Sequence, residues 1–290
     1  MSTAAAIGPA FSLVIPAFNS RAYLPANVSR AGECLARAGI DAEIVVADDG
    51  SSDGTPDAVP AGDRVRVLRL PHAGKGAALR AGMMAATGEV RGFTDADLPY
   101  GLDAIPLALQ YVRERRYHAV IGDRTLPGAE YESPGPLRRV VSEVASFAFR
   151  TLVTGGIYDT QCGFKVFRGD VAGEIFRLAR IDGFAIDVEL IYLLLKYRLD
   201  VKRIPVRLER TAPSSVRVIR DSARAFTDIA RIRGRWAAGR YRSPILERLL
   251  QEDLRADVER SAALSRASEP GEGSTGPAGP HDEPARSART

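Results

Sequence analysis

The chain has 290 residues, and its 45% hydrophobic and 26% charged residues are typical of a globular protein that buries a sizeable core. A formal net charge of +4 is too small to identify an anionic partner by itself. Cys34 and Cys162 are the only cysteines, so a disulfide framework is excluded and a reducing compartment is favoured.

The sequence predicts neither a targeting signal nor a membrane span. The first residues, MSTAAAIGPAF, lack the basic region and the long apolar run of a signal peptide. The most apolar stretch, around 191–198, is interrupted by Lys196 and is shorter than the roughly 20 residues of a membrane helix. We expect a cytoplasmic protein, either soluble or peripheral at the inner face of the membrane.

Short β-rich runs alternate with helical runs over the first 125 residues. This alternation predicts an α/β fold, a mostly parallel sheet with helices on both faces. Ligands of such sheets bind beyond the carboxyl ends of the strands, and polar residues gather at those ends here. The expected strands are 11–18, 42–49, 65–70, 89–96 and 118–124, and the expected helices are 21–39, 75–87 and 102–116.

The pattern changes after residue 125, where a Gly- and Pro-rich loop begins. The segment from 215 to about 260 reads as basic helix. The tail 265–290 is rich in Pro, Gly and Ser, and it is predicted to be disordered because it cannot bury enough apolar surface to offset its ordering entropy. Further expected elements are a helix at 137–155, a loop entering a short strand at 159–170, a helix at 186–198 and a strand at 201–208.

Two carboxylates, Asp95 and Asp97, follow the fourth expected strand in the stretch FTDADLPY. In an extended chain, residues i and i+2 point the same way, so both side chains can face one spot. Oxygen ligands suit Mg²⁺ or Mn²⁺, and a substrate diphosphate would complete the shell. The alternative is a solvated turn beside Pro99. The alignment with other polar strand ends favours the metal site.

Two further motifs have a structural and a functional interpretation. Asp48 and Asp49 begin DDGSSDGT, which suits the cap of a following helix as well as an acceptor for a base N–H and ribose hydroxyls. The stretch GKGAALRAG places Lys75 at a helix start that suits phosphate, although it is not a GxxxxGK[ST] loop. On these residues alone, a simple helix start is the favoured interpretation of the second motif.

Together these motifs resemble a known family. VIPAFNS, VVADDGSSDGT, GKGAALRAGM, FTDADLP and GDR, in this order, are similar to the inverting family-two glycosyltransferases with the nucleotide-sugar (GT-A) fold. DTQCGFKVF, FAIDVELIYL, VKRIPVRL and SSVRVIRDSARAFTDIARIR narrow the resemblance to dolichyl-phosphate β-glucosyltransferases and bacterial polyprenyl-phosphate hexosyltransferases. The resemblance covers about 11 to 240.

The resemblance implies a division of the chain and a role for individual residues. Phe18 stands where the family pattern usually has Tyr, and Pro99 stands where related mannosyltransferases add a metal-binding Gln. The implied segments are a flexible 1–10, a GT-A catalytic domain at 11–212 (nucleotide-sugar half 11–124, acceptor half 125–212), basic amphipathic helices at 213–264 and the tail 265–290. The implied residues are Pro16, Phe18, Asn19, Asp48, Lys75, Asp95 and Ala96 for the donor, Asp95 and Asp97 for the metal, and Arg124, Arg138, Arg139, Asp159 and Gln161 for the acceptor.

Inversion requires in-line attack opposite the leaving nucleotide diphosphate. A phosphate monoester acceptor is largely anionic at neutral pH, so it needs arginines such as Arg124 rather than a strong base. A hydroxyl acceptor requires a carboxylate base, for which Asp187 and Glu189 are the candidates. Only one of these can point inward from a helix, and a helix cap or a salt bridge to Lys165 or an arginine is its structural alternative. Asp97, Arg124, Asp187 and Glu189 are thus the catalytic candidates.

Three functions remain open on the sequence. The first is transfer of a hexose, from UDP-glucose by the resemblance, to polyprenyl phosphate. The second is the same donor chemistry on a soluble small molecule, and the third is a non-catalytic protein that binds polyanions or membranes. The pair Asp95 and Asp97 speaks against the third. The basic segment 216–242 suits an ordinary packed helix, a nucleic-acid patch or an anionic membrane surface; we favour the packed helix with a membrane contact and expect no nucleic acid. The oligomeric state is not predicted.

Overall fold

The computed structural model describes residues 8–60, 62–129, 162–208 and 218–268. These form two compact units, one that ends at Glu247 and one that begins at Arg248, and each is considered by itself. The helix expected at 137–155 lies outside the described residues, as do Arg138, Arg139, Asp159 and Gln161.

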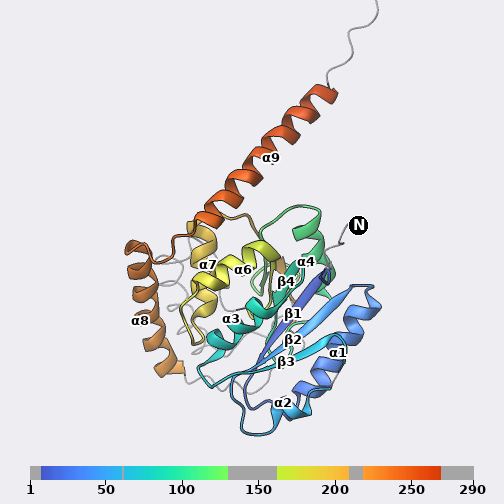
Figure 1. The fold of residues 1–290 in the computed structure, drawn as a ribbon, viewed down its shortest axis with the longest axis vertical. Coiled ribbons are helices and arrows are strands. Elements are labelled where there is room, and N and C mark those ends of the chain that lie inside the picture. The colour runs from blue at the N-terminus through green and yellow to red at the C-terminus, as the bar shows by residue number, and fades with distance from the viewer. Residues whose placement is uncertain (1–7, 61, 130–161, 209–217, 269–290) are drawn as a thin grey trace, which may run out of the picture. The chain divides into compact units, whose positions relative to one another are not determined.

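A seven-stranded sheet forms the centre of the first unit, with strand order β3-β2-β1-β4-β6-β5-β7. All neighbouring strands are parallel except around β6, which runs antiparallel to both β4 and β5. The expected α/β fold with a mostly parallel sheet is therefore confirmed (Figure 1). The strands are β1 Phe11–Ala17, β2 Ala42–Asp48, β3 Val65–Arg69, β4 Val90–Phe93, β5 Ala119–Asp123, β6 Lys165–Arg168 and β7 Val201–Pro205.

Helices cover both faces of the sheet, which is why every residue of β1 is buried. Leu13 and Ile15 of β1 belong to the core shared with α1 and α4, whereas Val14 between them contacts Gly82 of α3. A Cβ atom at Gly82 would lie 2.5 Å from a Val14 methyl carbon, so the glycine lets α3 pack closely on the sheet. Figure 1 shows the sheet between α1 and α3. The helices are α1 Leu24–Arg37, α2 Thr55–Ala58, α3 Lys75–Ala85, α4 Ala104–Arg113, α6 Gly169–Leu178, α7 Ile186–Lys196, α8 Val218–Ala237 and α9 Pro244–Ser268.

The described elements match the expected ones, with two helices missed. The short α2 was absorbed into a turn, and α6 begins directly after β6 with a glycine, a poor helix former, so its start gave no signal. The basic segment forms two helices, of which α8 packs on α7 within the first unit through Trp236 and Tyr192. Helix α9 continues to Ser268, inside the tail expected to be disordered. Within the described ranges, no helix combines the length and hydropathy that crossing a bilayer requires.

Candidate active site

The carboxyl ends of β1, β2, β4 and β5 meet at one edge of the sheet, and antiparallel β6 begins there. Lys165, the first residue of β6, pairs with Phe93 of β4 on one side and with Ile121 of β5 on the other. The preceding loop therefore runs between the strand ends. A Cβ atom at Gly163 would lie 2.0 Å from Oδ2 of Asp95, so only glycine allows this approach to the carboxylate.

Asp95 and Asp97 come together in a turn and not in an extended strand. The backbone N–H of Leu98, which has a φ of +44°, donates to the Asp95 carbonyl at 3.0 Å. The side-chain amide of Asn27 on α1 donates to the carbonyl of buried Ala96 at 2.9 Å and fixes the turn. The pKa of the Asp97 carboxyl is raised, first by burial and then by the negative charge of Asp95. The pair is therefore close, but the reason expected from strand alternation was wrong.

Four charged side chains alternate in sign beside this turn. Lys75 Nζ lies 2.7 Å from Asp95 Oδ1 and 3.6 Å from Asp187 Oδ2. Lys165 Nζ donates to Asp187 Oδ1 at 2.5 Å and to the Cys162 carbonyl at 2.7 Å. Burial alone would lower the pKa of Lys75, but the carboxylates of Asp95 and Asp187 raise it above the usual value. Burial acts against the Asp187 carboxylate too, yet Lys165 and Lys75 lower its pKa.

The N-terminus of α3 is already occupied by backbone and side-chain acceptors. The N–H groups of Gly76 and Ala77 donate to the Asp182 carbonyl at 2.7 and 3.2 Å, and Gly74 N–H donates to Asp49 Oδ2 at 2.9 Å. These N–H groups are not available to a phosphate. The helix-start interpretation of GKGAALRAG is therefore correct for its backbone, while the Lys75 side chain still reaches the site.

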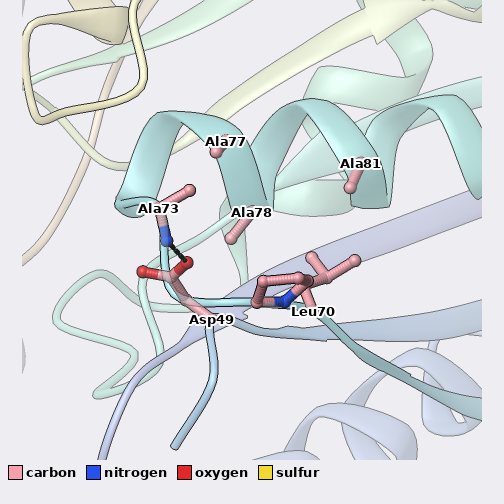
Figure 2. Close-up of a pocket in the computed structure, with 7 residues that line it drawn as sticks. Asp49, Leu70, Ala73, Ala77, Ala78 and Ala81 are labelled. Carbon is pink, nitrogen blue, oxygen red and sulfur yellow. Dashed lines mark hydrogen bonds between the residues drawn. The ribbon is translucent and has the colours of Figure 1, made fainter.

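The neighbours Asp48 and Asp49 differ in what their carboxylates bind. Asp49 accepts from the N–H of Ala73 at 2.8 Å (Figure 2), and its Oδ2 lies 2.9 Å from His72 Nδ1, so it fixes the loop before α3. Asp48 Oδ2 accepts from the N–H of Ser51 at 3.1 Å. Asp48 Oδ1 is buried and finds no hydrogen-bond partner among the described residues. Asp49 is thus the structural residue, and Asp48 retains an open acceptor.

A pocket of about 210 Å³ lies between the end of β3 and α3 (Figure 2). Its lining is alanine-rich, and its one carboxylate, that of Asp49, is already satisfied by backbone N–H groups. A ligand there would find no unpaired polar side chain among the lining residues, so we do not assign the nucleotide to it. The lining residues are Asp49, Leu70, Pro71, Ala73, Ala77, Ala78 and Ala81.

The loop after β1 presents an aromatic face and a tethered asparagine. Phe18 is 46% exposed and stacks on His72 with ring centroids 4.3 Å apart. Asn19, with a φ of +48°, accepts from the N–H of Ser52 at 2.9 Å and thereby ties this loop to the one after β2. Pro16 is buried within β1, where it lies opposite Ala47 of β2.

The donor atoms at the Asp95–Asp97 turn suit a hard divalent cation. Carboxylate oxygens are the ligands that Mg²⁺ and Mn²⁺ prefer, and Mg²⁺ sites commonly pair one or two carboxylates with substrate phosphates. Among the described residues no three or more His, Cys, Asp or Glu side chains gather as a complete metal site. The residues present therefore fit a cation that shares its shell with a phosphorylated substrate.

Comparison with known proteins identifies the family. The family model for glycosyl transferase family 2 matches residues 12–176. The chain belongs to glycosyl transferase family 2. It is 28% identical over 245 residues to a dolichyl-phosphate β-glucosyltransferase of Dictyostelium discoideum (79% of this chain, 75% of the relative). It is 33% identical over 218 residues to the corresponding Drosophila melanogaster protein (68% and 66%).

Solved structures support the GT-A-type fold of this glycosyltransferase. Mannosyl-3-phosphoglycerate synthase from Rubrobacter xylanophilus has a TM-score of 0.60 at 18% identity, with 81% of this chain and 78% of that one covered. Glucosyl-3-phosphoglycerate synthase from Mycobacterium tuberculosis, in complex with Mn²⁺, UDP-glucose and phosphoglyceric acid, has a TM-score of 0.58 at 17% identity (78% and 80%). At these identities the likeness establishes the fold alone.

The two carboxylates of IDVEL have different roles in the glycosyltransferase. Both are buried, although only one was expected to point inward. Glu189 Oε2 accepts from the N–H groups of Arg180 and Ile181 at 2.9 and 2.8 Å, and Oε1 accepts from the Tyr241 hydroxyl. Glu189 therefore does not fit the role of a general base. The salt bridge to Lys165, the structural alternative, is confirmed for Asp187.

Arg124 is positioned by its neighbour at the end of β5. Asp123 is fully buried and accepts from the N–H of Thr125 at 2.8 Å and from Arg203 at 3.0 Å. The turn that carries half-buried Arg124 is thereby fixed at the same edge of the sheet as Asp95. Arg124 is the one predicted acceptor residue within the described part of the chain, because the others lie in 130–161.

Two residues that organise the site, Lys165 and Asn27, were not among the predicted site residues. The sequence predicts Lys165 only as an ion-pair partner, although a lysine inside the apolar run FKVF indicates a buried charge with a dedicated partner. Asn27 lies on the buried face of α1, where a polar side chain requires a hydrogen bond. Its partner, the Ala96 carbonyl, cannot be inferred from the sequence.

Proposed function

We propose that this glycosyltransferase transfers glucose from UDP-glucose to a polyprenyl phosphate, with inversion and with a divalent cation bound by Asp95 and Asp97. The observation that carries the proposal is the turn that brings these two carboxylates together beside Lys75 at the carboxyl edge of the sheet. The similarity to dolichyl-phosphate β-glucosyltransferases supports the sugar and the lipid acceptor.

The donor site is proposed around Asp48 and the Phe18–His72 pair. The buried Asp48 Oδ1 lacks a hydrogen-bond donor, and a uracil imide N–H or a ribose hydroxyl supplies one. The stacked rings of Phe18 and His72 add an aromatic surface beside the same strand ends. The UDP-glucose bound in the Mycobacterium tuberculosis synthase supports this donor class.

The charged groups suit a diphosphate leaving group. When bound, Mg²⁺ or Mn²⁺ neutralises the negative charge that grows on the departing nucleotide. Lys75 adds a second positive charge beside Asp95. Asp187, which is itself paired with Lys165, lies 3.6 Å from Lys75 Nζ and keeps this positive charge near the site when Asp95 binds other groups.

A phosphate acceptor fits the site better than a hydroxyl acceptor does, because the carboxylates of Asp187 and Glu189 are already bonded to other groups. A phosphate monoester is already largely anionic at pH 7, so it attacks the anomeric carbon without a strong base. Glu189 is satisfied by hydrogen bonds, and Asp187 is ion-paired with a lowered pKa, so both are poor bases. Arg124 would bind the acceptor oxygens through its planar fork of donors.

We also propose that the face of α8 turned away from the core contacts an anionic membrane. Ile229 and Ile232 are buried, whereas Arg231 and Arg233 on the same helix are exposed. Basic side chains near a membrane surface each add about 1 kcal/mol of attraction to anionic lipid. A lipid-linked acceptor would then be presented at the surface on which the enzyme rests.

The experiment is a donor and acceptor screen. Radiolabelled UDP-glucose, GDP-mannose and UDP-GlcNAc are each incubated with a short polyprenyl phosphate and Mn²⁺, and product is extracted into organic solvent. Label from UDP-glucose in the organic phase, lost with EDTA, is the expected result. Nucleotide release with the labelled product in the aqueous phase would support the soluble acceptor instead. No turnover of any donor would refute the proposed activity.

A further inference from the structure

The positively charged ammonium of Lys75 contacts Asp95, one of the two proposed metal ligands. Its Nζ lies 2.7 Å from Asp95 Oδ1, a charge-assisted hydrogen bond, with the two side chains 16% and 30% exposed. Asp95 is thus already neutralised before a divalent cation arrives. Because two cations repel each other, a metal ion at Asp95 and the Lys75 ammonium compete for the same carboxylate oxygen.

A second carboxylate is available to Lys75. Asp187 Oδ2 lies 3.6 Å from Lys75 Nζ, within ion-pair range but beyond a direct hydrogen bond. A small rotation of the lysine side chain away from Asp95 would shorten this contact. Lys75 therefore has an alternative carboxylate partner besides the proposed metal ligand Asp95.

Lys165 fixes that second carboxylate. It is fully buried, and its Nζ binds both Asp187 Oδ1 and the Cys162 carbonyl. Asp187 on α7 is consequently anchored by one oxygen while the other is directed at Lys75. A buried carboxylate with one oxygen pinned is a rigid acceptor for a moving ammonium.

We propose that Lys75 is the internal competitor of the divalent cation: it neutralises Asp95 in the free enzyme and transfers to Asp187, which Lys165 holds, when the cation and nucleotide bind. The inference rests on the proposed metal site at Asp95 and Asp97. It adds that the enzyme weakens binding of the metal ion alone and favours binding of the metal ion with a nucleotide diphosphate, because the diphosphate gives the displaced ammonium a further anionic partner.

The test is Mn²⁺ binding without nucleotide, measured by electron paramagnetic resonance or calorimetry. Lys75→Met should bind Mn²⁺ about tenfold more tightly than the wild type, because the competing charge is gone. Lys75→Gln keeps a hydrogen-bond donor without the charge, so its Mn²⁺ affinity should rise by a similar factor. The matched control is Lys202→Met, the same charge change on edge strand β7 beside Tyr111, with an expected effect below about twofold.

The nucleotide provides a readout of opposite sign. Lys75→Met should bind UDP about tenfold more weakly than the wild type does, because the diphosphate loses the Lys75 ammonium as a partner. Asp187→Asn should weaken binding of Mn²⁺ without nucleotide, because Lys75 then lacks its second carboxylate and stays on Asp95. This effect of Asp187→Asn should be smaller in the Lys75→Met variant, which has no ammonium to transfer. If Asp187→Asn fails to fold in a thermal melt, the two Lys75 variants still decide the question.

A folded Lys75→Met protein that binds free Mn²⁺ no more tightly than the wild type would overturn the inference. If the wild type binds Mn²⁺ with UDP and turns over donor, that result leaves the proposed function intact. If no variant binds Mn²⁺ with or without UDP and turnover is independent of metal, the metal site and this inference both fail.

Discussion

The backbone N–H of Ile181 donates to Glu189 Oε2 at 2.8 Å, and through this bond α7 fixes the loop that closes the N-terminus of α3. The next residue, Asp182, supplies the carbonyl that accepts from Gly76 and Ala77. A carboxylate that was a candidate base is therefore part of the scaffold beneath Lys75. It is fully buried, and both of its carboxylate oxygens already accept hydrogen bonds.

Glu189→Gln should destabilise the protein without abolishing catalysis. The amide group must turn an N–H donor toward either the backbone N–H groups or the Tyr241 hydroxyl, all of which donate to Glu189. We expect a loss of about 1–3 kcal/mol in the free energy of unfolding, measured by urea denaturation. The turnover number of the folded fraction should stay within about threefold of the wild type, whereas removal of a general base typically costs 10²- to 10⁴-fold. A loss of that size in stable, folded protein would restore Glu189 as the base.

Asp48→Asn and Asp49→Asn should separate nucleotide binding from loop stability. Asp48 has one buried carboxylate oxygen without a partner, so its change should weaken UDP binding by about 10- to 100-fold with little effect on melting. Asp49 is bound by the N–H groups of Ala73 and Gly74, so its change should lower the melting temperature. Calorimetry with UDP and thermal melts distinguish the two. Unchanged UDP affinity in Asp48→Asn would contradict its assignment to the donor.

This pair also illustrates what the sequence could and could not predict. The strands, most helices and the edge that holds the site followed from alternation of β-rich and helical runs. The choice between Asp48 and Asp49 did not, because the loop that binds Asp49 comes from residues 72–74 beyond β3. Hydrogen-bond partners brought together by tertiary structure leave no local pattern.

The carboxylate pair gives the same lesson for geometry. The sequence predicts that Asp95 and Asp97 lie close together because they share one face of a strand. In the structure they are close because of a turn, which Asn27 of α1 holds by a hydrogen bond to the Ala96 carbonyl. Lys165 reaches the site only because β6 runs antiparallel between β4 and β5, a register that no local pattern encodes. Arg124 follows β5 as expected, while the remaining acceptor candidates lie in the part of the chain that is not described.

Asp97→Ala should abolish metal-dependent turnover. Loss of one of the two proposed ligands weakens binding of the divalent cation, which would stabilise the negative charge on the leaving diphosphate. We expect on the order of a 10³-fold decrease in the turnover number. Nucleoside diphosphate release as a function of Mn²⁺ concentration is the measurement. The control is Asp41→Ala, an exposed carboxylate that pairs with Arg64, which should remain active. Near-normal turnover in Asp97→Ala would refute the metal assignment.

Arg124→Ala should affect the acceptor and spare the donor. Removal of a charge-assisted bond to a phosphate should raise the KM for polyprenyl phosphate by about 10- to 100-fold, with the KM for UDP-glucose within about twofold. Arg124→Lys should recover only part of the loss, because an ammonium lacks the planar fork. Arg64→Ala, an exposed arginine paired with Asp41, is the control. A donor KM that rises while the acceptor KM stays constant would reverse the assignment.

Glu43 should stabilise the protein at neutral pH and lose this effect in acid. It is buried at the start of β2 and accepts from the Ser12 hydroxyl at 2.7 Å and from the Thr87 N–H at 2.7 Å, with Arg66 at 2.9 Å. Burial acts to raise its pKa, but the bonds from Thr87 and Ser12 and the charge of Arg66 together lower it below the reference of 4.5. A lowered folded-state pKa means that the stabilisation is complete above 4.5 and is lost as the pH falls through the lower folded value.

Glu43→Gln should therefore lower the free energy of unfolding by about 1–3 kcal/mol at pH 7, and its difference from the wild type should narrow below pH 4.5. Urea denaturation from pH 7 to pH 3 measures both effects. Glu89→Gln changes an exposed glutamate paired with Arg113, so it should show little change at any pH. A constant difference between Glu43→Gln and the wild type across this range would mean that the hydrogen bonds to Glu43 do not depend on its charge.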